Sequence, residues 1–341
     1  MTKVSQKHAR PVRVVALGGG TGLSTLLRGL KEYVAQGAQN RAKRLISDLA
    51  AVVTVTDDGG SSGRLRREYR ILPPGDIRNC MVALSDDEYL LSRLFQYRFP
   101  VGPGLGGHTF GNLFLTALTN VTGDFPEAVR LSSGVLAIRG RIFPSTAQNV
   151  TLQAELEGGK VVAGETKISR SRRRIERVRL VPRRVRPLPE VLTAIRRADL
   201  ILVGPGSLYT SLIPNFLVDE VVEVIAHSRA TRVYIANVMT QPGETQGYSV
   251  ADHVRAIDKH CERKLFDAVV VSRAPVSQRI IRRYKAQGAE PVRPALNELR
   301  DMGLKAITGD LLHQHGVVRH DPDRLASLLI KEFVTSKASL E

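Results

Sequence analysis

The chain has 341 residues, 43% of them hydrophobic, and carries a formal net charge of +17. This length allows one large α/β domain or two ordinary ones, with enough apolar residues for a sizeable core. No window reaches the 18 uninterrupted apolar residues of a membrane span, and the basic start lacks an apolar signal region. Cys80 and Cys261 lie far apart without CxxC spacing, which argues against a disulfide framework or a thiolate metal site. These features predict a cytoplasmic globular protein.

The most informative stretch is VRVVALGGGTGLSTLLRGL, at residues 12–30. Its apolar run predicts a parallel strand buried on both faces, and the spaced leucines that follow predict a helix. Between them stand Gly19, Gly20, Thr21 and Gly22, where glycine permits positive φ and a close approach of a ligand to backbone N–H groups. A helix N-terminus at this point attracts anions. The cluster is neither a full GxGxxG nor a P-loop with its lysine, so it predicts a phosphate or nucleotide site, with a plain tight turn as the alternative.

A second buried strand, expected over residues 49–56, ends in the sequence DDGGSSG. A strand, a helix and a second strand imply a right-handed crossover, so the two glycine loops should face each other at the carboxyl edge of a parallel sheet. Asp57 and Asp58 in the second loop are therefore candidates for holding Mg²⁺ or the hydroxyls of a ribose. Solvated turn acids are the alternative.

Two further glycine-containing motifs, LPPGDIRN and GHTFGNL, each precede a helix. Asp76 is predicted to be the N-cap of the first helix. Arg78 and Asn112 are candidate phosphate or sugar contacts, and His108 is a candidate proton carrier or a packed ring. The second helix is expected to bury its apolar stripe, which consists of Phe110, Leu113, Phe114, Ala117 and Leu118.

Residues from about 130 to 187 alternate between short strands and turns, which predicts a small antiparallel β subdomain inserted in the sheet. Nine arginines between Arg170 and Arg186 could form a nucleic-acid face, but the near absence of aromatic residues among them favours a charged edge strand. The sheet is expected to resume with a strand over residues 199–203. That strand ends in Gly204, Gly206 and Ser207, a second glycine and hydroxyl loop suited to an anion.

Six motifs occur in one order along the chain: GGGTGLS, TVTDDGGSSGRLR, LPPGDIRN, GHTFGNL, ADLILVGPGSLYTSLIPN and NVMTQPGET. This combination resembles the bacterial gluconeogenesis-factor family (YvcK-like), in the superfamily of CofD, the 2-phospho-L-lactate transferase of coenzyme F420 synthesis. The resemblance implies a Rossmann-like α/β fold, with a mostly parallel sheet and helices on both faces. We expect one such domain over residues 12–330, between a disordered tail at 1–11 and a C-terminal tail at 331–341.

The resemblance also implies a function. It suggests a cytoplasmic, homodimeric regulatory protein that binds UDP-sugars. Such a protein would be needed for growth on gluconeogenic carbon and for cell shape and wall synthesis. The superfamily's phosphate pocket carries over onto Gly19 to Gly22, Asp57 with Asp58, and Gly204 to Ser207. The family patterns YxxxGxxPV and RHDxxxLA match Tyr284 and Arg319, which become candidate contacts to the base or sugar.

Three hypotheses follow, and the regulatory protein is preferred over an enzyme because no compelling nucleophile and base pair is present. It would require no cofactor, and cell-wall regulatory proteins are its expected partners. The second hypothesis is a Mg²⁺-dependent transferase acting on a nucleoside-diphosphate-linked substrate, with Asp57 or Asp58 holding the metal and His108 carrying a proton. The turn GPGSLYTS differs from the GPSNP-type turn expected of the transferases, which counts against phospholactate transfer. The third and least favoured is nucleic-acid binding through residues 170–186.

Overall fold

The computed structural model describes residues 10–35, 44–86, 90–100, 102, 104–171, 173–314 and 317–336. Most of the tail expected over residues 1–11 lies outside these ranges, as do residues 337–341. Helix α14 (Pro322–Ile330) continues into the π-helical turn η4 (Lys331–Thr335), in which Phe333 and Val334 are buried. The packed chain therefore extends beyond the boundary expected at residue 330.

The central sheet is parallel throughout its seven strands, which lie in the order β10-β9-β8-β7-β1-β2-β3. The strands are β1 (Val12–Gly18), β2 (Ile46–Val53), β3 (Arg141–Pro144), β7 (Leu200–Val203), β8 (Thr231–Ile235), β9 (Ala268–Ser272) and β10 (Lys305–Gly309). From β1, the chain adds β2 and β3 on one side and β7 to β10 on the other. The strand order thus reverses between β1 and β7, the switch point where open α/β sheets bind ligands.

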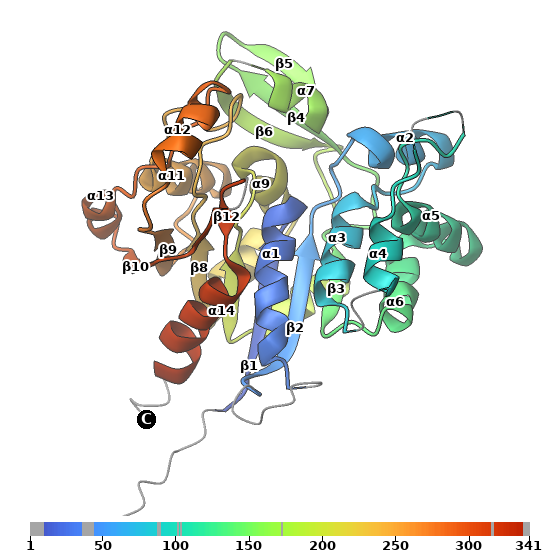
Figure 1. The fold of residues 1–341 in the computed structure, drawn as a ribbon, viewed down its shortest axis with the longest axis horizontal. Coiled ribbons are helices and arrows are strands. Elements are labelled where there is room, and N and C mark those ends of the chain that lie inside the picture. The colour runs from blue at the N-terminus through green and yellow to red at the C-terminus, as the bar shows by residue number, and fades with distance from the viewer. Residues whose placement is uncertain are drawn as a thin grey trace, which may run out of the picture.

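Helices cover both faces of this sheet, which confirms the expected Rossmann-like architecture. On one face α1 (Gly20–Leu30) packs against α3 (Gly75–Leu84) and α14 (Figure 1). The connections from β7 to β10 run in the opposite direction, so right-handed crossovers place their helices on the other face. These helices are α10 (Val221–Ala226), α11 (Val250–Cys261) and α13 (Leu296–Asp301), and α8 (Pro189–Arg197), which precedes β7, packs against α10. None of the described helices has the length and apolar character needed to cross a membrane.

The apolar residues of β1 and α1 that the sequence pattern predicts to be buried lie in the core. Residues 14–17 of β1 are at most 2% exposed, as expected for a strand covered on both faces. Helix α1 buries Leu23, Leu26, Leu27 and Leu30 completely, and each buried leucine contributes about 1.5–3 kcal/mol. Cys80 and Cys261 are buried free thiols that pack in this core.

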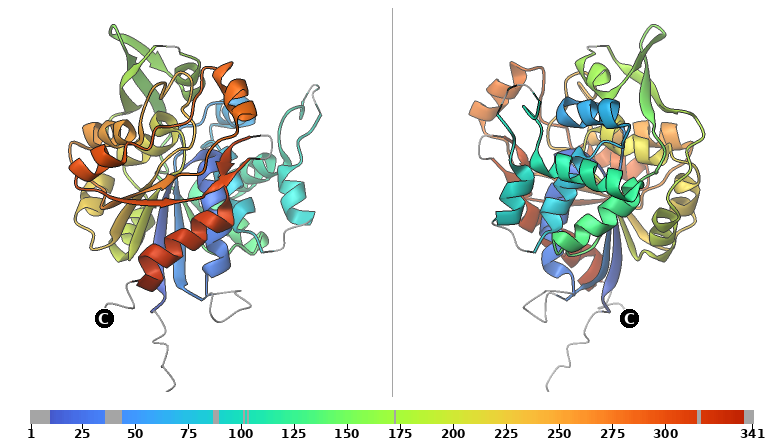
Figure 2. Two further views of the ribbon diagram at one scale, coloured as in Figure 1. Left: turned by 60° about the vertical axis from the view of Figure 1, so that its left-hand side comes forward. Right: turned by 90° about the vertical axis from the view of Figure 1, so that its right-hand side faces the viewer.

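The helices beyond β3 form a flank of the molecule (Figure 2). They are α2 (Gly60–Tyr69), α4 (Leu90–Gln96), α5 (Phe110–Thr122) and α6 (Phe125–Val135). On α5 the expected apolar stripe is only partly buried, although Phe110 and Phe114 pack against the core, and Ala117 is exposed. The fully buried residues of the helix are Gly111, Asn112, Leu115, Thr116 and Thr119. Hydrophobic periodicity identifies the apolar face of a helix but does not reveal which face the rest of the chain covers.

A small antiparallel sheet stands above the carboxyl edge of the central sheet (Figure 1). Its strands lie in the order β5-β4-β6, namely β4 (Thr151–Leu156), β5 (Lys160–Ala163) and β6 (Ile175–Val181), with α7 (Glu165–Arg170) between β5 and β6. This confirms a small antiparallel insertion, but its sheet is narrower than residues 130–187, since β3 pairs with β2 in parallel. Alternating residues identify a strand without identifying its partner. The arginine-rich β6 is an edge strand, as its charge pattern predicts.

Short elements complete the described chain. They are η1 (Lys31–Tyr33), η3 (Leu208–Leu212), α9 (Ile213–Phe216), α12 (Gln278–Lys285), β11 (Leu312–His313) and β12 (Arg319–His320). Of these, α12 and β12 lie toward the carboxyl edge of the sheet, where β12 contacts α1 (Figure 1).

Candidate nucleotide-binding site

The loops that follow β1 and β7 touch at the switch point. A Cβ atom on Gly22 would lie 2.2 Å from the carbonyl oxygen of Pro205, so glycine here lets the start of α1 pack directly on the second loop. Gly19 caps α1 in an extended conformation, and the first turn holds no acidic residue. In the described part of the chain, the N–H groups of Thr21 and Gly22 have no acceptor. They remain available to an anion at the positive end of the helix.

Asp76 lies beneath the first glycine loop. Its Oδ2 accepts the N–H of Gly20 at 2.7 Å, and a Cβ on Gly19 would lie 2.8 Å from the same oxygen. The expected N-cap role of Asp76 is wrong, because α3 is capped by Pro74 and Asp76 already lies in its first turn. Burial, followed by the charge of Asp57, raises the pKa of Asp76 to about 6. This carboxylate therefore fixes Gly20 and, when charged, opposes an incoming anion.

Side chains that follow β8 hold the second loop in place. The N–H of Gly206 donates to Oδ1 of Asn237 at 3.1 Å, and Nδ2 of Asn237 donates to the carbonyl of Gly206 at 2.8 Å. Nε2 of Gln241 donates to Oγ of Ser207 at 2.7 Å. Gly204 has φ of +82°, a conformation that L side chains rarely adopt. The loop from Gly204 to Ser207 is thus a preformed structure.

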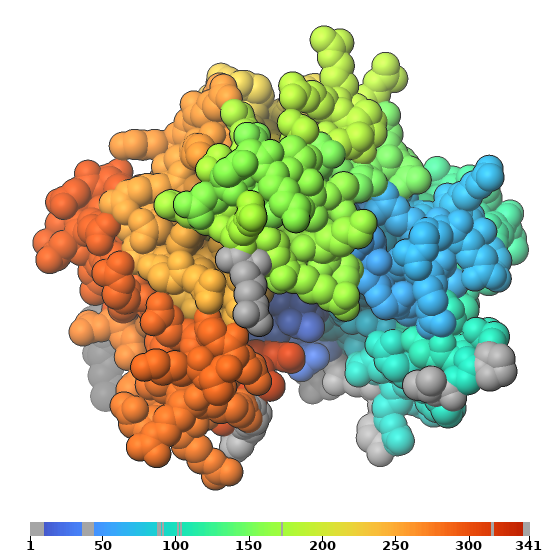
Figure 3. Space-filling model, turned by 90° about the horizontal axis from the view of Figure 1, so that it is seen from above, coloured from blue at the N-terminus to red at the C-terminus, as the bar shows by residue number. Residues whose placement is uncertain are grey.

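A cavity of about 370 Å³ opens over both loops, and this volume falls in the usual range for small-molecule sites. Seen from above, the first loop lies at the bottom of a hollow between the C-terminal segment and the inserted sheet (Figure 3). Four parts of the chain line the cavity. They are residues 19–22 with 25, residues 205–207 with 211, residues 237–242, and residues 284, 287, 289 and 317–320.

Tyr284 on α12 and Arg319 on β12 line the same cavity as the glycine loops. Oη of Tyr284 accepts the N–H of Val318 at 3.1 Å, which ties the two segments together. The guanidinium of Arg283 lies 5.6 Å from the centre of the Tyr284 ring. Arg319 is exposed, so the charge of its guanidinium is available at the mouth of the cavity. Residues far apart in the sequence thus meet at one site.

Asp57 and Asp58 do not line the cavity. Oδ1 of Asp57 accepts the N–H of Gly59 at 2.8 Å. Oδ1 of Asp58 accepts both the N–H of Thr166 at 2.9 Å and its hydroxyl at 2.7 Å, which anchors α7 of the insertion. Burial and the charge of Asp57 raise the pKa of the neighbouring Glu165. In the ranges described above, no three His, Cys, Asp or Glu side chains are arranged to hold a metal ion. These residues form no metal centre by themselves, and Mg²⁺ at Asp57 and Asp58 stays a prediction.

Replacing Thr166 with valine should loosen the insertion. The change removes one hydroxyl that donates to the Asp58 carboxylate, and such a bond to a charged group contributes about 1.5–3 kcal/mol. We expect the free energy of unfolding, measured by denaturant titration, to fall by that amount. Thr193→Val removes a hydroxyl bonded only to its own helix and is the control. Equal stability of the two variants would show that Asp58 does not anchor the insertion.

Arg78, His108 and Asn112 form a buried network to one side of the acidic loop. Oγ of Ser61 lies 2.9 Å from Nδ1 of His108 and accepts from Nδ2 of Asn112 at 3.0 Å. Nη1 of Arg78 donates to Oγ1 of Thr109 at 2.6 Å. Burial lowers the pKa of His108, and the charge of Arg64 adds to this effect. In this arrangement the three side chains join α2, α3 and α5 and do not line the cavity. Their ligand contacts stay predictions.

Sequence reasoning missed Asn237, Gln241 and the contact between Asp76 and Gly20. Asn237 and Gln241 follow β8 directly, and the rule that loops after parallel strands share one edge would have identified them. No local signal indicates the Asp76 contact, because it joins residues 56 positions apart.

The chain matches known proteins over most of its length. The family model of 2-phospho-L-lactate transferase CofD matches residues 14–312. The gluconeogenesis factor of Bacillus subtilis is 48% identical over 319 residues, which cover 93% of this chain and 97% of that protein. The gluconeogenesis factor of Halalkalibacterium halodurans is 44% identical over 329 residues, which cover 96% and 98%. A crystal structure of a UPF0052 family member from Bacillus halodurans has a TM-score of 0.88 at 44% identity and covers 94% of this chain and 99% of that one.

These matches include both glycine loops at the switch point and all six ordered motifs. The same fold extends over almost the whole of a solved relative. This chain therefore belongs to the CofD family and, within it, to the gluconeogenesis factors.

Proposed function

We propose that this gluconeogenesis factor is a cytoplasmic regulatory protein that binds a nucleotide sugar of the UDP-sugar class at the switch point. In this role it would serve growth on gluconeogenic carbon, cell shape and wall synthesis. The observation that carries the proposal is the meeting of free N–H donors of α1 with Tyr284 and Arg319 in one cavity. The donors suit any nucleoside diphosphate, and the choice of UDP-sugar rests on the family resemblance.

Each part of the cavity has a role in this proposal. The N–H groups of Thr21 and Gly22 and the hydroxyl of Ser207 would bind the diphosphate, because backbone donors at a helix N-terminus favour phosphate oxygens. The guanidinium of Arg319 would pair with a phosphate or with sugar hydroxyls. The ring of Tyr284 offers a surface on which a base can stack.

The composition of the cavity supports binding over catalysis. Its described lining contains no Asp, Glu, Cys or Lys, and these are the usual general bases and nucleophiles besides histidine. His320 does line the cavity, but burial lowers its pKa to about 4. At neutral pH this ring is therefore uncharged and a weak base.

The match to the CofD transferase model favours a second candidate, a Mg²⁺-dependent transferase acting on a nucleoside-diphosphate-linked substrate. Mg²⁺ often binds through one or two carboxylates together with substrate phosphates. Of the two acids, Asp57 is the better candidate ligand, because Oδ1 of Asp58 already accepts two hydrogen bonds from Thr166. Turnover of a labelled nucleotide sugar or nucleotide-linked acid by the pure protein would support this candidate. Absence of turnover across a broad panel would remove it.

The direct test of the binding proposal is a thermal-shift titration with UDP-N-acetylglucosamine, UDP-glucose, GDP, NAD and ADP, each with and without Mg²⁺. A ligand at a hundred times its Kd adds about 2.7 kcal/mol to the stability of the folded state. Shifts with UDP-sugars alone would support the regulator, whereas a GDP shift that requires Mg²⁺ would support the transferase. No shift with any of these compounds would overturn the proposal.

Arg319→Ala should lower the affinity for the UDP-sugar that gives the largest shift. A hydrogen bond to a charged group contributes about 1.5–3 kcal/mol, so Kd should rise by about tenfold to a hundredfold. Tyr284→Ala should cost about 1–3 kcal/mol through lost stacking. Arg279→Ala removes an equal charge from α12 outside the cavity lining and is the control in calorimetric titrations. If Arg319→Ala and Arg279→Ala weaken binding equally, Arg319 acts only through long-range charge.

A further inference from the structure

The small sheet of the insertion has two edges, and their surroundings differ. On the β6 edge, the N–H of Val178 donates to Nε2 of His260 on α11 at 3.0 Å, so the main body of the protein lies against this edge. On the other edge, β5 pairs with β4 and with no further strand among the described residues. Figure 1 shows β5 at the top of the molecule, where the insertion stands clear of the central sheet. The β5 edge is thus open.

The register of the β4–β5 hairpin shows which backbone groups of β5 face outward. The N–H of Gly164 donates to the carbonyl of Leu152 at 2.8 Å, so these two residues form a hydrogen-bonded pair. Such pairs occupy every second position of an antiparallel ladder, which assigns the even-numbered residues of β5 to β4. The N–H and C=O groups of Val161 and Ala163 therefore point away from β4. They are placed to pair with the backbone of an added strand.

A groove of about 670 Å³ follows this open edge. Residues 156 and 160–163 line one side of it, and residues 167, 170, 171 and 173 line the other. We call it the β5 groove. Its first side is mostly apolar, with Leu156 buried and Val161 46% exposed. An exposed apolar edge strand is a template for pairing with another chain.

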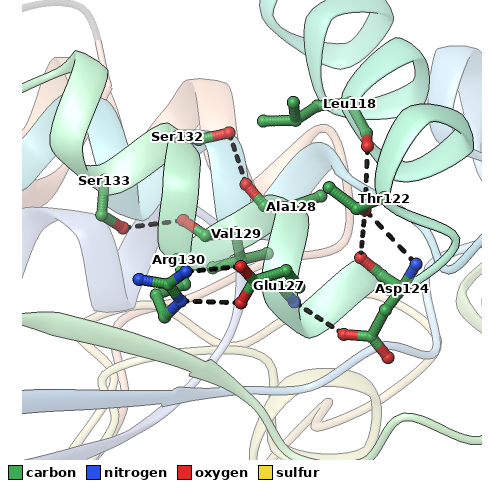
Figure 4. Close-up of polar contacts among 9 residues, drawn as sticks. All are labelled: Leu118, Thr122, Asp124, Glu127, Ala128, Val129, Arg130, Ser132 and Ser133. Atoms are coloured by element: carbon green, nitrogen blue, oxygen red, sulfur yellow. Dashed lines mark hydrogen bonds and ion pairs between the residues drawn. The ribbon is translucent and has the colours of Figure 1, made fainter.

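The β5 groove carries charge of one sign. Its described lining includes no acidic residue but four exposed basic ones, namely Lys160, Lys167, Arg170 and Arg173. None of the four forms an ion pair within the described ranges. Exposed arginines elsewhere do pair, as Arg130 does with Glu127 at 2.6 Å between Nε and Oε2 (Figure 4). Unpaired cations along a groove favour an acidic ligand.

The position of these charges differs from that of charges that protect an edge strand. Protective charges stand on the edge strand itself, where they oppose an incoming strand. On β5 only the first residue, Lys160, is charged. The other three cations belong to α7 and the segment after it, on the opposite side of the groove. Cations in that position attract an acidic strand and leave the edge free to pair with it.

We propose that the β5 groove is a docking site for an extended acidic segment of a partner protein, which adds a strand to β5. The outward backbone groups of Val161 and Ala163 would bond to the added strand. Side chains of a strand alternate between its two faces, so acidic residues at every second position would meet the cations across the groove. This inference does not depend on the proposed function, because none of its residues lines the nucleotide cavity.

Other occupants fit the β5 groove less well. A second copy of this chain, paired through the same edge, would bring two sets of four cations together. Single-stranded nucleic acid binds through bases stacked on aromatic rings, and none of the described lining residues is aromatic. An anionic membrane would attract the cations, but its lipid tails would leave the outward N–H and C=O groups without partners.

Fluorescence anisotropy with a labelled peptide tests the inference. The probe is a short capped peptide in which glutamate alternates with valine, and the control probe has lysine in place of each glutamate. The glutamate probe should bind the wild-type chain saturably, with a Kd that rises as salt increases, and the lysine probe should not bind. Absence of saturable binding of the glutamate probe would overturn the inference, and so would equal binding of both probes.

Val161→Pro separates strand addition from attraction by charge. Proline removes an N–H that points outward, and edge strands accept proline at such positions, so the fold should persist with an unchanged melting temperature. The Kd of the glutamate probe should rise by about tenfold. Val161→Ala keeps the N–H and is the control, for which the Kd should change much less. If the two variants bind the probe equally, the peptide does not add a strand and the inference is wrong.

Arg170→Glu tests the charge of the groove independently of its backbone. The Kd of the glutamate probe should rise by about tenfold, because like charges would then meet. Arg183→Glu makes the same charge change at an exposed position outside the groove and is the matched control. Equal weakening by both variants would mean that net charge alone attracts the peptide, against the inference. Phosphatidylglycerol vesicles or an oligonucleotide that displace the probe, and bind Val161→Pro as tightly as wild type, would identify a membrane or a nucleic acid as the occupant instead.

Discussion

Replacing Gly22 with alanine is expected to abolish nucleotide binding and to reduce stability. The new Cβ would lie 2.2 Å from the Pro205 carbonyl oxygen, which is backbone and cannot rotate away. Overpacking of this kind costs about 1–3 kcal/mol. Relief of the clash requires the two loops to separate, which displaces the free N–H donors of α1. Since each charge-assisted bond contributes about 1.5–3 kcal/mol, losing two of them should weaken binding by about a hundredfold or more.

Gly134→Ala is the matched control for this substitution. A Cβ at this position on α6 meets nothing within 4 Å, so alanine should stabilise the helix by about 0.5–1 kcal/mol. Denaturant unfolding measures the stability of both variants, and calorimetry measures their affinity for UDP-N-acetylglucosamine. Wild-type affinity in Gly22→Ala would show that the ligand does not depend on the junction of the two loops.

Asp76→Asn is expected to stabilise the protein at neutral pH. The pKa of Asp76 rises from 3.8 in the unfolded chain to about 6 in the folded one. Its contribution to stability is therefore fully present below about pH 3.8 and is lost as the pH rises through about 6. The loss above that pH approaches 3 kcal/mol on the order-of-magnitude scale of this pKa shift. Asparagine keeps an acceptor for the N–H of Gly20 and has no charge, so the variant should avoid this loss.

Melting temperatures between pH 4 and pH 7.5 test this expectation. The difference between Asp76→Asn and the wild type should be smallest at the acid end and largest above pH 6. Asp301→Asn makes the same charge change at an exposed position of α13 and controls for net charge. A difference between Asp76→Asn and wild type that does not vary with pH would contradict the assignment.

The same variant separates the two proposed functions. Without Mg²⁺, removing a negative charge beneath the anion site should strengthen binding of UDP-N-acetylglucosamine by roughly tenfold. If binding weakens instead and depends on Mg²⁺, the Asp76 carboxylate acts on a metal-bound ligand, and this result would favour the transferase candidate.

The sequence predicts those parts of the fold that local signals determine. The helix after the first glycine loop is one example, since the spaced leucines that predict it form the buried face of α1. The glycine loops are another, because each follows a buried strand and precedes a helix. Their meeting at one edge follows from the right-handed crossover rule applied to the strand pattern.

The remaining features depend on contacts between distant segments. Polar and apolar residues alternate along β3 as in any strand. This alternation does not indicate that β3 pairs in parallel with β2. The orientation of α5 depends on hydrogen-bond partners such as Ser61, which lies in another helix. Tyr284 and Arg319 were assigned to the site through family resemblance alone, since neither has a local pattern that indicates a ligand.

The cavity also determines when the site can exist during synthesis. Its lining begins at Gly19 and ends at His320, so nearly the whole chain must leave the ribosome before the site is complete. Chains are made from the N-terminus at about 5–20 residues per second, and during that time the first glycine loop has no C-terminal segment above it. A ligand that needs both segments would therefore bind only finished molecules, and it would stabilise them over truncated products.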